Sequence, residues 1–182
     1  MLFVASSSIM IYNEYQINFD GGIIMNKSIV AYFSASGTTA EVAKRLAAII
    51  HADEFEIKPE KPYSDAGLRW TNPLARCNRE KFGKKDVPIA GKIENIDEYD
   101  TIFIGFPIWY YGAPNIINTF VKSYDLSSKK IILFATSGGS DIGKTAEKLK
   151  PYLSNGAEIT DAKVFLRSVS IGELKAWAEM YL

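Results

Sequence analysis

Short apolar segments alternate with amphipathic segments along most of this chain, and this alternation limits the folds that it can adopt. The apolar segments are rich in Ile, Val and Phe and are predicted to be buried strands. The expected strands are residues 28–33, 53–57, 100–105, 130–135 and 158–166, and the expected helices are residues 38–50, 114–124, 141–153 and 170–181. Strands that alternate with helices predict an α/β fold, a three-layer α/β/α sandwich with a five-stranded parallel sheet.

One connection, residues 58–92, is longer than a single crossover helix requires. We expect a helix near residues 65–82 with loop on either side. The segment carries nine basic residues against four acidic ones. Such an excess is usually a solvated face, and the weaker alternative is that it attracts the phosphates of a pyridine nucleotide.

Composition excludes several classes of protein. The chain has 182 residues, 47% hydrophobic and 23% charged, as expected for one globular domain. Its formal net charge is zero, which argues against nucleic-acid binding, and no apolar run is long enough for a membrane span. A single Cys and a single His leave little for a metal site or a Ser–His–Asp triad. We therefore expect a bound cofactor to carry the chemistry, with no catalytic side chain and no metal.

The first 24 residues differ in composition from the rest. They contain no basic residue, and residues 20–27 back-translate to a sequence that resembles a bacterial ribosome-binding site ahead of Met25. We hypothesise that residues 1–24 are a translated leader or extension, and that residues 25–182 form the functional domain, located in the cytoplasm. Mass spectrometry of the natively expressed protein would test this division.

Three loops are expected to meet, because ligands of an open parallel sheet bind beyond the carboxyl ends of its strands. The loop after the first strand leads into a helix and offers hydroxyls, a glycine and free N–H groups, as a phosphate site does. The alternative is that its hydroxyls only cap the helix. This loop consists of Ser34, Ala35, Ser36, Gly37, Thr38 and Thr39.

The other two loops follow the third and fourth strands. The first of them is aromatic and is predicted to form a stacking platform; it contains Pro107, Ile108, Trp109, Tyr110, Tyr111 and Gly112. The second, residues 136–140, has two adjacent glycines that let a ligand approach the backbone closely.

A competing motif overlaps the last of these loops. Residues 138–145 fit the pattern G-x-x-x-x-G-K-[ST] and follow a predicted strand, as a P-loop does. Only 37 residues follow, with one predicted strand and Asp161 near its start. This leaves no room for a second acidic strand, so a P-loop nucleotide binder stays a remote alternative.

In this order the three loops resemble those of the flavodoxin family, in particular a short bacterial branch with a Pro-Ile-Trp-aromatic loop. The resemblance covers about residues 27–182 and implies the strand order 2-1-3-4-5 and a non-covalently bound FMN. It implies that residues 34–39 hold the phosphate, that Trp109 flanks the isoalloxazine, and that Ser137, Gly138 and Gly139 border its pyrimidine side. The third loop carries no aromatic residue, so the other face of the ring is expected to be open or covered by segment 58–92 with its Trp70.

The resemblance also implies a redox function. The first expectation is an oxidoreductase that passes electrons or hydride from NAD(P)H to a quinone-like acceptor. The second is an electron carrier for a redox partner protein, and the third is a binding module without flavin. The sequence leaves the oligomeric state open between monomer and dimer.

Overall fold

The computed structural model describes residues 16–17, 23–24 and 26–182. Two short strands, β1 (Gln16–Ile17) and β2 (Ile23–Ile24), pair in an antiparallel arrangement. Met25 and most of the hypothesised leader lie outside the described residues, so the proposed start at Met25 stays a prediction.

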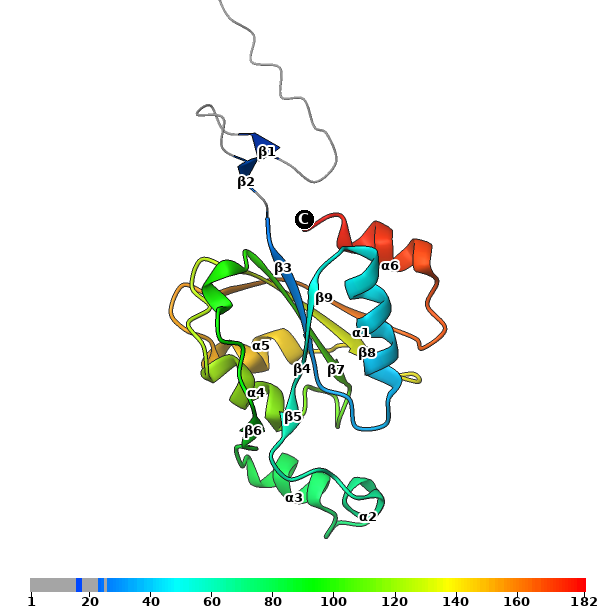
Figure 1. Cartoon of the computed structure of the whole chain (residues 1–182). Helices are drawn as coiled ribbons and strands as arrows, with labels where there is room; N and C mark the ends of the chain where they lie inside the picture. Colours follow the sequence, from blue (N-terminus) through cyan, green and yellow to red (C-terminus); the bar gives the residue numbers. More distant parts are fainter. Residues whose placement is uncertain (1–15, 18–22, 25) are drawn as a thin grey trace, which may run out of the picture.

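A five-stranded sheet forms the centre of the molecule (Figure 1). Its strands are β3 (Ser28–Tyr32), β4 (Asp53–Glu56), β7 (Thr101–Pro107), β8 (Lys130–Thr136) and β9 (Glu158–Phe165). Every pairing within it is parallel, and the order is β4-β3-β7-β8-β9. In chain order this is 2-1-3-4-5, so the predicted fold class and strand order are confirmed.

Helices cover both faces of this sheet, because successive side chains of its buried strands point to opposite sides. On one face Val30 and Phe103 pack with α1 (Thr38–Ile49) and α6 (Ile171–Ala178). On the other face Ile104 and Leu133 pack with α4 (Asn115–Lys122). The two apolar clusters confirm the three-layer sandwich.

Segment 58–92 departs from its prediction. The expected helix over residues 65–82 is wrong: α2 (Asp65–Leu68) and α3 (Arg76–Gly83) are separate helices. Pro73 explains the break, since a proline disfavours helical conformation at the residue before it. Asn72 instead forms a turn, with its Oδ1 accepting from the Leu74 N–H at 3.0 Å. Strands β5 (Lys58–Pro59) and β6 (Ile89–Ala90) pair at the ends of the segment, which lies at one end of the molecule (Figure 1).

The helix expected over residues 141–153 is also shorter than predicted. Helix α5 spans Thr145–Leu149 and continues as a 3₁₀ turn, η2 (Lys150–Tyr152); a similar turn, η1 (Ile96–Glu98), precedes β7. Gly143, at a φ of +48°, lies just before α5 in the left-handed region, which a continuous helix cannot include. Within the described part of the chain, no helix has the length and apolar character needed to cross a membrane.

Candidate functional site

The loop after β3 ends at the N-terminus of the twelve-residue helix α1. Gly37 adopts a φ of +86°, which favours glycine, and its carbonyl accepts the Glu41 N–H at 3.0 Å. None of the described side chains caps this helix. The first backbone N–H groups of α1 therefore point out of the helix without intrahelical partners, an arrangement that favours an anion.

The hydroxyl groups of this loop have different surroundings. Ser34 Oγ is buried and has no hydrogen-bond partner among the described residues, which is costly unless a ligand or water supplies one. Ser28 Oγ is also buried and unpaired in that same part of the chain, but at the amino end of β3. Thr39 Oγ1 lies 2.7 Å from Thr136 Oγ1, and this buried pair joins α1 to the end of β8. The Thr39 hydroxyl therefore has a structural role, since it links α1 to β8.

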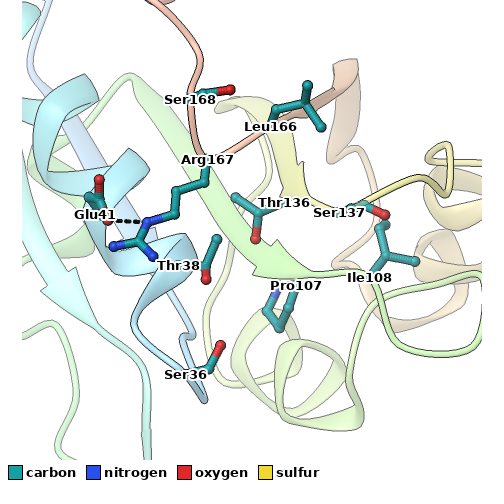
Figure 2. A pocket seen from close by; sticks show the side chains of 11 residues that line it. Ser36, Thr38, Glu41, Pro107, Ile108, Thr136, Ser137, Leu166, Arg167 and Ser168 are labelled. Carbon is teal, nitrogen blue, oxygen red and sulfur yellow. Dashed lines mark hydrogen bonds and ion pairs between the residues drawn. The ribbon is translucent and has the colours of Figure 1, made fainter.

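An open pocket of about 750 Å³ lies where these strands end (Figure 2). It brings together six of the predicted site residues: Ser36, Thr38, Pro107, Ile108, Ser137 and Gly138. The remaining predicted residues, Ser34, Ala35, Gly37, Thr39, Trp109, Tyr110, Gly112 and Gly139, are all described by the structure but are not among the lining residues. Thr136, from the predicted loop 136–140, also lines the pocket. The lining further includes residues that the sequence did not indicate, Glu41, Leu166, Arg167 and Ser168.

The loop after β7 makes a tight turn at its aromatic residues. Tyr110 and Tyr111 have φ angles of +50° and +58°, an uncommon conformation for side chains of this size. The Trp109 N–H donates to the Gly112 carbonyl at 2.9 Å and closes the turn. Each non-glycine residue with left-handed backbone angles destabilises the folded state by about 1 kcal/mol or more, so surrounding contacts must stabilise the turn.

Contacts from segment 58–92 hold this turn. The Tyr110 hydroxyl contacts Asn78 Oδ1 and donates to the Trp70 carbonyl at 3.2 Å. Lys81 Nζ donates to the Ala113 carbonyl at 2.6 Å. Burial, together with the nearby Lys148 ammonium, lowers the pKa of Lys81 to about 8. The long connection therefore supports the aromatic loop.

Trp109 itself packs edge to face in an aromatic cluster. Its ring centroid lies 5.6 Å from that of Phe33 and 5.6 Å from that of Tyr63, with interplanar angles of 86° and 85°. The Tyr63 hydroxyl donates to Glu80, and Arg76 Nε donates to the other oxygen of that carboxylate at 2.6 Å. Burial and the Glu80 carboxylate raise the pKa of Tyr63, so this phenol stays protonated at neutral pH.

The loop after β8 is organised by one of its own side chains. Ser137 Oγ accepts the N–H groups of Gly139 at 3.2 Å and Ser140 at 2.8 Å. A Cβ added at Gly138 or Gly139 would meet nothing within 4 Å. Neither glycine is required by packing within the described chain, and both leave open space beside the pocket.

The P-loop alternative has little support in this geometry. Thr145 is buried, and its hydroxyl donates to the Ile142 carbonyl at 2.5 Å, so it does not face a nucleotide-bound metal ion. Lys144 is exposed and lies 3.9 Å from Glu147. Helix α5 has only five residues and begins after the motif's lysine.

The sheet order and the loops at its carboxyl edge define an α/β protein with a flavodoxin-like fold. The family model described as flavodoxin matches residues 27–181, and the chain belongs to this family. A protein described as a flavoprotein from Bacteroides eggerthii is 40% identical, with a TM-score of 0.79 over 85% of this chain and 97% of its own. A similarly described protein from Bacteroides uniformis is 39% identical, with a TM-score of 0.79 over 85% and 98%.

A more distant structure shares the fold alone. It is a flavoprotein from Lactobacillus acidophilus in complex with FMN, 22% identical, with a TM-score of 0.60 over 84% of this chain and 99% of its own. No match was found among curated proteins.

Proposed function

We propose that this chain binds FMN at the carboxyl edge of its sheet and acts as an oxidoreductase. It accepts electrons or hydride from NAD(P)H and passes them to a quinone-like acceptor. The observation that carries the proposal is a group of hydrogen-bond donors in the loop after β3 that lack partners within the described chain. There Ser34 Oγ is buried without a partner among the described residues, beside a helix N-terminus that no described side chain caps.

These features fit the phosphate group of FMN. The uncapped N–H groups of α1 and the Ser34 hydroxyl are hydrogen-bond donors, and a phosphate offers strong acceptor oxygens. The Bacteroides proteins of 39–40% identity, described as flavoproteins, support the same assignment. The FMN complex from Lactobacillus acidophilus shows that this fold accommodates FMN in that protein.

The two other loops are assigned to the flavin ring. Trp109 is half-buried in its aromatic cluster, and Gly138 and Gly139 leave space for the ring edge. FMN, when bound, supplies the redox chemistry, and the protein contributes binding, orientation and a defined electrostatic environment. Segment 58–92 fixes the aromatic loop through Lys81 and Asn78.

An absorbance spectrum of the purified protein, followed by FMN titration of the flavin-free protein, tests the cofactor assignment. We expect a yellow protein and saturable binding with quenching of flavin fluorescence. A colourless protein that does not bind added FMN would refute the proposal, and stabilisation by Mg-ATP alone would favour the P-loop alternative.

Substitution of Trp109 tests the placement of the ring. Trp109→Ala is expected to weaken FMN affinity by about 1–3 kcal/mol if the flavin stacks there. Met180→Ala is the control, because Met180 is 65% exposed near the C-terminus and belongs neither to the three loops nor to segment 58–92. Equal affinities of the Trp109 variant and the wild type would remove Trp109 from the site.

An electron-carrier function is the second candidate, and an exposed apolar surface favours it. Trp70, Phe82 and Tyr111 are 70%, 69% and 74% exposed on and beside the segment that supports the aromatic loop. Exposed aromatic groups of this kind are typical of protein contacts. Steady-state NADH or NADPH oxidation with a quinone supports the enzyme, whereas flavin reduction only by a separate reductase supports the carrier.

A further inference from the structure

An ion pair joins two elements across the pocket. Arg167 Nε, in the loop after β9, lies 2.7 Å from Glu41 Oε2 in the first turns of α1. Both side chains line the same pocket as Ser36 and Thr38, and Arg167 extends over that pocket toward Glu41 (Figure 2). A guanidinium group therefore lies at the same pocket as two residues of the loop assigned to the phosphate.

The backbone that carries Arg167 is fixed more firmly than its side chain. Arg45, one turn after Glu41 on α1, donates to the Arg167 and Val169 carbonyls, each at 2.7 Å. The side chains of Arg167 and Glu41 remain 70% and 45% exposed. An ion pair this exposed is weak, so the guanidinium can exchange partners while its backbone stays in place.

The charges in the pocket give a reason for such an exchange. The loop at residues 34–39 contains no Lys or Arg. A phosphate monoester carries nearly two negative charges at neutral pH, and the Glu41 carboxylate in the same pocket would repel it. Arginine binds phosphate through two parallel hydrogen bonds, a geometry that one Nε contact to a carboxylate oxygen does not use.

We propose that Arg167 is a specificity residue that leaves Glu41 and pairs with the phosphate of FMN. It thereby makes the site selective for a phosphorylated flavin over riboflavin. This inference rests on the proposed function. Glu41 holds the guanidinium at the pocket while the phosphate is absent, and Arg45 positions the loop that presents it.

Parallel titrations of the flavin-free protein with FMN and with riboflavin test this role, because the two ligands differ only in the phosphate. Arg167→Gln is expected to weaken FMN binding roughly tenfold, as expected for loss of charge-assisted hydrogen bonds, and to leave riboflavin binding within about twofold. Glu41→Gln frees Arg167 and removes a repulsive charge, so it is expected to tighten FMN binding by about two- to fivefold.

Lys175→Gln is the matched control, since it removes one positive charge from another exposed ion pair, which Lys175 on α6 forms with Glu179 just after that helix. It is expected to leave both affinities unchanged. Added NaCl is expected to reduce the preference for FMN over riboflavin in the wild type but much less in the Arg167 variant. Thermal unfolding of each variant verifies that the fold is retained.

The failures of the two proposals are distinguishable. If Arg167→Gln weakens both ligands equally or neither, or if the wild type binds riboflavin as tightly as FMN, the role of Arg167 is refuted while flavin binding stands. If the wild type binds neither ligand, both proposals are refuted.

Discussion

Replacing Lys81 by methionine tests how segment 58–92 holds the aromatic loop. Lys81 Nζ donates to the Ala113 carbonyl at 2.6 Å, and it is the side chain nearest to the position of a Cβ built at Gly112. Burial and the Lys148 ammonium lower its pKa from 10.5 to about 8. The folded protein therefore binds the Lys81 proton less tightly than the unfolded chain does.

The sign and size of the effect follow from linkage. Each pKa unit corresponds to about 1.4 kcal/mol, so the full difference is about 3 kcal/mol, and screening at this partly exposed amine reduces it to about 1–2 kcal/mol. Below about pH 8 both states are protonated, and the cost of the buried charge is present in full. Between about pH 8 and 10.5 only the unfolded state keeps the proton, so the free energy of unfolding rises with pH.

Urea unfolding at several pH values from 7 to 10 measures how the free energy of unfolding depends on pH. Over that interval the wild type is expected to gain about 1–2 kcal/mol relative to Lys81→Met. The variant also loses the hydrogen bond to the Ala113 carbonyl, which changes its stability at every pH. The diagnostic quantity is therefore the pH dependence of the free energy of unfolding, compared between the wild type and the variant. Lys148→Met removes the repulsion and is expected to shift the rise to higher pH, whereas Lys44→Met, at an exposed position of α1, is expected to leave it unchanged. Identical pH dependence in the wild type and Lys81→Met would refute the reasoning.

Two further substitutions test the scaffold beneath the site. Thr39→Val leaves the Thr136 hydroxyl buried without its partner and is expected to cost about 1–2 kcal/mol in chemical denaturation; the double variant with Thr136→Val should recover most of that loss, and an equal or larger loss would contradict the pairing. Gly105→Ala places a Cβ 2.1 Å from the Phe134 ring and is expected to cost about 3 kcal/mol or more, because ring and strand cannot both keep their positions. Partial rescue by Phe134→Leu, measured by thermal unfolding, would confirm the clash, and an unchanged melting temperature of the single variant would exclude it.

The fold was predictable because its strongest signals are local. Buried parallel strands are continuous apolar runs, and the segments that became β7 and β8 are among the clearest in the chain. The secondary structure of segment 58–92 is harder to predict from the sequence, because its tertiary contacts compete with helical periodicity. Pro73 lay within the predicted helix, and its effect on the preceding residue was the signal that could have divided it.

The candidate site was predictable only where its residues come from the ends of strands. Ser36, Ile108 and Gly138 lie together because the carboxyl ends of parallel strands share one edge. Glu41 and Arg167 are 126 residues apart, and nothing in the local sequence of either indicates the other. Their contact depends on the loop after β9 folding back onto α1, which only a three-dimensional arrangement shows.

The two loops assigned to the flavin ring differ in how they are held. The loop after β7 contains two tyrosines at positive φ and depends on Lys81 and Asn78 from a distant segment. The loop after β8 depends on the Ser137 hydroxyl and carries glycines with open space around them. Under the proposed function, one side of the ring meets a loop fixed by tertiary contacts, and the other meets a backbone free to approach it. Part of the basic character of segment 58–92 therefore has a structural use, since Lys81 and Arg76 act as donors that fix the aromatic loop and its cluster.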